Sequence, residues 1–76
     1  KLSEKHMNGQ RFAEAAAILE KLVLFEPNST GVRSNLGICY AQLSHNQKAR
    51  EQFLKVLEIE PGHSAAKTNL QILDSG

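Results

Sequence analysis

The chain has few of the residues that cross-link, break or dominate small folds. Of its 76 residues one is cysteine, two are proline, none is tryptophan and 5% are aromatic. A single cysteine, Cys39, excludes an intramolecular disulfide and any zinc site built from several cysteines. That count fits a reducing compartment, for which we expect the cytoplasm; a periplasmic or secreted protein without disulfides would show the same count.

Charge of one sign and long apolar runs are also missing. The nine Lys and Arg residues are scattered and the formal net charge is +1, whereas nucleic-acid binding needs positive charge gathered on one face. The longest apolar stretches, Ala15 to Leu19 and Leu22 to Phe25, are far shorter than the roughly 20 residues that span a bilayer. With no signal-peptide pattern either, we expect no nucleic-acid partner and no membrane insertion.

Residues arranged for chemistry are equally scarce. His6, His45 and His63 are dispersed, and no His/Glu cluster has metal-ligand spacing. Cys39 lies in an apolar helical stripe, where an inert buried thiol is favoured over a nucleophile. There is no glycine-rich phosphate loop and no Ser/His/Asp pattern. We therefore predict a non-catalytic chain with no metal and no cofactor, although a parent protein could carry an enzyme elsewhere.

What the chain does have is helical spacing of its apolar residues, interrupted by turn residues. The breaks fall at Asn8-Gly9, at Pro27-Asn28-Ser29, at Ser44-His45-Asn46 and at Pro61-Gly62. Between them the apolar residues recur three and four apart, and no segment alternates as a strand would. The pattern predicts an all-α chain with five helices, over residues 1–8, 10–26, 30–43, 46–60 and 64–74. Ser64 is the predicted N-cap of the last helix.

The strongest signal is a match of the chain to itself at an interval of 34 residues. Leu2, Leu36 and Leu70 fall at this interval, as do Pro27 and Pro61. A fixed period of this length indicates stacked supersecondary units, none of which can bury its apolar face alone. Such arrays present an extended surface to other molecules, so the period favours a binding module.

The repeat resembles the tetratricopeptide repeat family, whose 34-residue unit is a pair of helices, A and B. In the second unit the family pattern falls on Leu36, Gly37, Tyr40, Ala49, Phe53 and Pro61, with Arg33 and Val56 where an aromatic residue and a second alanine are expected; the first unit retains Leu2, Ala15, Leu22 and Pro27. The resemblance implies a right-handed α-solenoid of antiparallel helix pairs, about two units followed by a C-terminal capping helix.

In terms of domain organisation, we expect one domain over residues 1–76. A partial repeat covers 1–29, a second repeat covers 30–63, and a capping helix or partial third repeat covers 64–76. Because the chain starts in mid-repeat and without an initiator methionine, we expect it to be a piece of a longer protein.

The family resemblance also implies where a ligand binds, because the A helices of such arrays line a concave face. By position this face consists of Ser34, Asn35, Ile38, Ala41, Gln42, Thr68, Asn69 and Ile72. The set is uncharged and combines amides with aliphatic side chains. Such a surface suits a peptide segment or a helix of a partner protein.

Two arrangements of polar residues could let this face bind a peptide. Asn35 and Asn69 repeat at the period, and a carboxamide matches the donor and the acceptor of a peptide group. The alternative is that these asparagines only stabilise local turns or contacts between helices. A carboxylate clamp, which some members of the family use to hold a chain terminus, is disfavoured because Ser34, Ile38, Ala65 and Asn69 occupy its cationic positions.

Three functions follow from this interpretation. The favoured one is a protein-interaction scaffold that holds a partner segment on the concave face. The second is a self-assembly module, because a short array leaves apolar ends near Leu2 and Leu73 and so allows a homo-oligomer. The third is a substrate-docking segment of a larger enzyme.

Overall fold

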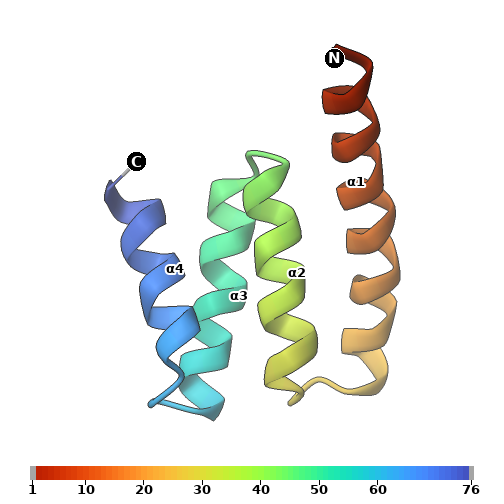
Figure 1. Cartoon of the computed structure of the whole chain (residues 1–76). Helices are drawn as coiled ribbons and strands as arrows, with labels where there is room; N and C mark the ends of the chain where they lie inside the picture. Colours follow the sequence, from red (N-terminus) through yellow and green to blue (C-terminus); the bar gives the residue numbers. More distant parts are fainter. Residues whose placement is uncertain (1, 76) are drawn as a thin grey trace.

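The computed structural model describes residues 2–75, with side chains described from Gln10 onward. It contains four helices: α1 (Leu2–Phe25), α2 (Thr30–Gln42), α3 (Asn46–Ile59) and α4 (Ser64–Ser75). Each helix packs on the next, so the four stand in a row (Figure 1). No strand occurs within the described range. The predicted all-α repeat architecture is confirmed.

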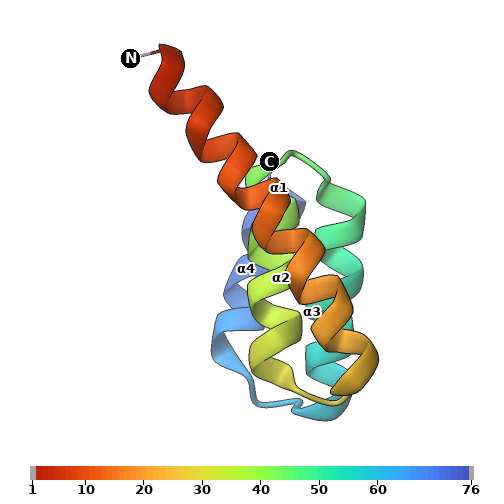
Figure 2. The ribbon, with the colours of Figure 1, turned by 90° about the vertical axis from the view of Figure 1, so that its right-hand side faces the viewer.

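The predicted turn at Asn8-Gly9 is wrong. The two helices expected at 1–8 and 10–26 are one continuous helix, α1, whose N-terminal part projects beyond the other helices (Figure 2). Glycine keeps its backbone N–H, unlike proline, so a helix can pass through it at a cost of about 1 kcal/mol relative to alanine. The Asn8-Gly9 pair therefore permits a turn but does not require one.

The later helix boundaries agree with the predicted ones to within one residue, and side chains of two different types cap the starts of α2 and α4. Ser29 precedes α2, and its Oγ accepts a hydrogen bond from the Val32 N–H at 3.3 Å. The predicted cap of α4 by Ser64 is wrong. His63 caps α4 instead, because its Nδ1 accepts a hydrogen bond from the Ala66 N–H at 3.1 Å, whereas Ser64 is already the first residue of the helix.

The core is centred on the contact between α2 and α3. Leu36, Phe53 and Val56 are its largest fully buried side chains. Gly37 lies directly against the ring of Phe53: a Cβ at position 37 would lie 2.8 Å from both Cε1 and Cζ of that ring. The phenyl group therefore fills the space that any side chain at position 37 would need, which explains the glycine in mid-helix.

A buried tyrosine joins α1 to α2. The Tyr40 hydroxyl donates a hydrogen bond to the Glu20 carboxylate. Burial, and then this bond and the negative charge of Glu20, raise the pKa of Tyr40 to about 12 from its ordinary value of 10.0. The protonated phenol is therefore the form that the folded protein stabilises.

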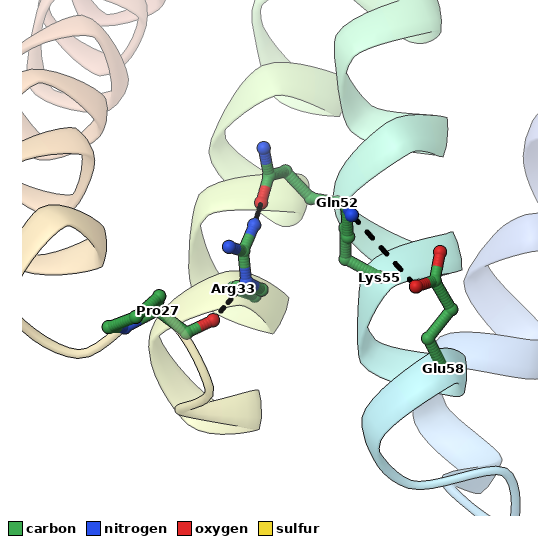
Figure 3. A network of polar contacts seen from close by, with 5 residues as sticks. All are labelled: Pro27, Arg33, Gln52, Lys55 and Glu58. Carbon is green, nitrogen blue, oxygen red and sulfur yellow. Dashed lines mark hydrogen bonds and ion pairs between the residues drawn. The ribbon is translucent and has the colours of Figure 1, made fainter.

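Arg33 ties the turn before α2 to the following helix (Figure 3). Its Nε donates to the Pro27 carbonyl oxygen at 2.6 Å, and its Nη1 donates to Gln52 Oε1 at 3.1 Å. Figure 3 also shows the ion pair of Lys55 and Glu58 on α3, at 3.9 Å. That exposed ion pair contributes little to stability. Arg33, in contrast, joins the turn between α1 and α2 to helix α3.

We predict that Gly37→Ala destabilises the chain by roughly 1–3 kcal/mol, because the new methyl group overpacks the Phe53 ring. The matched control is Gly31→Ala on the same helix, where the nearest atom is Ser29 Oγ at 3.9 Å. The control should be neutral or stabilising by up to about 1 kcal/mol. Urea denaturation followed by circular dichroism measures both, and equal stability of the two variants would contradict the tight contact.

The Tyr40 pKa predicts how stability depends on alkaline pH. Because the folded-state pKa is raised, the stabilisation is fully present below pH 10 and is lost as the pH rises towards 12. The free energy of unfolding of the unmodified chain should therefore fall more steeply between pH 10 and pH 12 than that of Tyr40→Phe. Urea titrations at several pH values test this, and parallel curves would show that the phenol is not held in its protonated form.

Candidate functional site

A groove of about 180 Å³ lies where α2, α3 and α4 meet. The A-type helices α2 and α4 supply its walls, and α3, which stands between them in the row, supplies part of its floor (Figure 1). Its lining residues are Ile38, Ala41, Gln42, Phe53, Asn69, Ile72 and Leu73. Small-molecule sites usually measure roughly 300–1,000 Å³. A groove of this size accommodates one large side chain rather than a whole cofactor.

The floor and walls of the groove are apolar. Phe53 contributes its ring, which is 1% exposed and is the same ring that packs against Gly37. Ile38 and Ile72 are 40% and 63% exposed, so they offer apolar surface that water still covers. Covering such surface is favourable by about 25 cal/mol per Å², so the groove favours an apolar occupant.

The polar atoms of the lining belong to neutral carboxamides. Gln42 is the last residue of α2 and is exposed, whereas Asn69 is half-buried on α4. None of the residues that line the groove is charged. The groove can therefore exchange hydrogen bonds with a peptide group but has no cation for a carboxylate.

The structure brings together five of the eight residues predicted to form the concave face. Ile38, Ala41, Gln42, Asn69 and Ile72 all line the groove. The other three lie outside its lining: Asn35 and Thr68 are exposed, and Ser34 is buried. Only one of the two repeated asparagines therefore contacts the groove.

Two lining residues, Phe53 and Leu73, were not expected there. The repeat pattern assigns Phe53 to the core, and it is indeed buried, yet its ring also forms part of the groove floor. Gly37 is the sequence feature that points to both positions of Phe53. Because the A helix α2 has no side chain at position 37, the Phe53 ring of the B helix α3 can pass beside it and reach the groove. Leu73 follows Ile72 and lies one turn beyond Asn69.

A second depression, of about 360 Å³, lies at the turn between α2 and α3. It is lined only by the consecutive residues Ser44 to Lys48, and Ser44 has a positive φ of 64°. Although it is the larger of the two, it belongs to a single turn and no other helix closes it. We therefore place the candidate site in the groove that three helices build.

The described side chains offer little for chemistry. No three His, Cys, Asp or Glu residues among them lie together as a metal site would require. Cys39 is buried, and burial raises the pKa of its thiol, which disfavours the reactive thiolate.

A model of the tetratricopeptide repeat family matches residues 7–71, which include α2, α3 and five of the seven residues that line the groove. The chain belongs to the tetratricopeptide repeat family. Repeats of this family generally mediate protein–protein interactions, and its members are typically non-catalytic scaffolds. Comparison of the chain with curated proteins and with solved structures finds no match. No helix within residues 2–75 combines the length and the apolar character needed to cross a membrane.

The buried hydroxyl of Ser34 gives a prediction about the stability of the fold. Its Oγ is buried and has no hydrogen-bond partner among the residues that the structure describes. An unpaired buried hydroxyl is unfavourable by about 1–3 kcal/mol, and alanine is the better helix former. Ser34→Ala should therefore raise the free energy of unfolding by about 1 kcal/mol in urea denaturation. A loss of stability would show that the hydroxyl has a bonding partner that supports the fold.

Proposed function

We propose that this tetratricopeptide repeat chain is a protein-interaction module that holds a short peptide segment of a partner in the groove between α2 and α4. The observation that carries the proposal is the composition of the groove: an apolar floor containing Phe53, walls containing Ile38 and Ile72, two carboxamides and no charged residue. One large apolar side chain of the partner enters the groove. The amides of Gln42 and Asn69 hydrogen-bond to the partner's backbone beside it.

The size of the groove sets the strength of the interaction. Burying one large apolar side chain contributes about 1.5–3 kcal/mol, and each neutral hydrogen bond contributes about 0.5–1.5 kcal/mol. After the entropy of association is subtracted, a single contact of this kind has a dissociation constant nearer millimolar than nanomolar. The module therefore suits transient binding, or binding in several copies.

The exposed residues of the predicted face extend the surface beyond the groove. Asn35 and Thr68 lie on the same two helices as the groove walls and are accessible to a longer partner segment. Ser34 is buried, so we assign it to packing between helices. A segment that runs past the groove would therefore meet polar side chains rather than a second apolar pocket.

The experiment starts from peptides selected from a random display library against the immobilised 76-residue chain. Their dissociation constants are then measured by fluorescence anisotropy for the unmodified chain, for Ile72→Glu and for Leu54→Glu. Ile72→Glu puts a carboxylate into the groove wall and should weaken binding at least tenfold. Leu54→Glu is the matched control, because Leu54 is 47% exposed on α3 but lies outside the groove lining.

The peptides themselves provide a second readout, since each should need one large aliphatic or aromatic side chain for binding. Replacing that side chain by alanine should weaken binding to the unmodified chain as much as Ile72→Glu does. Equal affinity of the two glutamate variants would place the binding surface elsewhere and defeat the proposal.

A further inference from the structure

The two A-type helices are capped at the same position of the repeat by side chains of different chemistry. Ser29 precedes α2 and His63 precedes α4, in two turns at the lower end of the row in Figure 1. Ser29 Oγ accepts from the Val32 N–H at 3.3 Å. His63 Nδ1 accepts from the Ala66 N–H at 3.1 Å. Both the two caps and their two donors are 34 residues apart, so an imidazole in one repeat replaces a hydroxyl in the other.

The imidazole of His63 can act as this cap only while it is neutral. Because its Nδ1 accepts a hydrogen bond, the proton of the neutral ring must be on Nε2. A second proton turns Nδ1 into a donor, and the Ala66 N–H then loses its acceptor. The positive charge would also lie at the N-terminus of α4, where the helix dipole disfavours a cation. Histidine side chains ordinarily gain this proton between roughly pH 8 and pH 5.

Few other charges lie near this ring, which stands between α3 and α4. Glu60 is the C-cap residue of α3 and precedes His63 in the same turn, and Lys67 follows one turn into α4. Both of these side chains are exposed. Further back on α3, Lys55 and Glu58 pair with each other at 3.9 Å. No carboxylate among the described side chains forms an ion pair with the His63 ring, so none of them holds the charged ring in its capping position.

The capped turn of α4 leads directly into the wall of the groove. Ala66, whose N–H the cap binds, is 0% exposed and belongs to the same core cluster as Phe53, which lies in the groove floor. The next turns of α4 carry the groove residues Asn69, Ile72 and Leu73. The cap therefore stabilises the turn that seats α4 in the core and positions these three side chains.

We propose that protonation of His63 releases the N-terminal cap of α4 and thereby weakens the groove. At neutral and higher pH the ring caps the helix and the groove is complete. As the pH falls through the range in which histidine gains its proton, α4 opens more often and the share of molecules with a complete groove falls. The effect on α4 does not depend on any ligand, whereas its effect on peptide binding rests on the proposed function.

Urea denaturation of the 76-residue chain at about pH 8 and about pH 5.5 tests the cap. His63→Ser installs the kind of cap that α2 has, which does not titrate in this range, and His63→Ala removes the cap at both pH values. The unfolding constant of the unmodified chain, divided by that of His63→Ser, should rise about fivefold at the lower pH. The same ratio for His63→Ala should not change with pH, because neither variant has the imidazole.

The matched control is His45→Ser. His45 precedes α3 at the corresponding end of that helix, but its side chain makes no cap hydrogen bond. This variant should therefore keep the fivefold change of the unmodified chain. Nitrogen NMR of the imidazole gives a direct readout of the bond, since at about pH 8 the proton of His63 should be on Nε2 and Nδ1 should have the shift of an acceptor.

Amide hydrogen exchange reports on the groove wall without any ligand. The exchange rates of residues 69–73 in the unmodified chain, relative to those in His63→Ser, should rise at least threefold from about pH 8 to about pH 5.5. The affinity of library-selected peptides without titratable side chains should fall over the same range for the unmodified chain but not for His63→Ser.

Three results would overturn the proposal: a proton on Nδ1 at about pH 8, a ratio of unfolding constants that does not change with pH, or relative exchange rates of residues 69–73 that do not change. Failure of the proposed function looks different. In that case Ile72→Glu and Leu54→Glu would bind the peptides equally well, while the unfolding constants and exchange rates would still depend on His63.

Discussion

The close contact between Gly37 and the ring of Phe53 is the constraint on which the rest of the structure depends. Helix α2 can approach α3 this far because position 37 has no side chain, and a Cβ there would lie 2.8 Å from two ring carbons. The ring then fills the centre of the core and is 1% exposed. It also contributes to the floor of the groove between α2 and α4. Stability and the candidate binding surface thus share one side chain.

The two ends of the row show how one repeat pattern yields different surfaces. The 34-residue interval relates Leu22 of α1 to Val56 of α3, and Gln71 of α4 to Gly37 of α2. Both Leu22 and Val56 are apolar, with exposed fractions of 38% and 0%, whereas the glycine becomes a polar side chain on α4.

Much of this architecture can be predicted from the sequence because packing positions repeat. Leu36, Ala49 and Phe53 match the family pattern and are buried, and the boundaries of α2, α3 and α4 agree with turn residues that disfavour helix. The prediction of a turn at Asn8-Gly9 is wrong because glycine lowers helix stability by only about 1 kcal/mol. Whether α1 continues through this pair therefore does not depend on these two residues alone. Likewise, the cap of α4 depends on where the His63 ring points.

The candidate site could be predicted only in part, for a related reason. Periodicity assigns each residue to one face, and it groups Ile38 with Gln42 and Asn69 with Ile72, all four of which line the groove. It cannot show that a large ring reaches through the core to a second surface, as that of Phe53 does. Nor can it show that Ser34 is buried while Asn35 is exposed, because that depends on how closely neighbouring helices approach.

The most direct test of this account is a nuclear Overhauser measurement between the Gly37 α-protons and the Phe53 ring protons in the isotopically labelled chain. The contact predicts strong cross-peaks and an upfield shift of the α-protons, since they lie against the aromatic ring. The same ring should show cross-peaks to the groove side chains of α4. Gly37 α-protons with ordinary shifts and no cross-peak to Phe53 would contradict the account, because neither the core nor the groove floor would then exist as described.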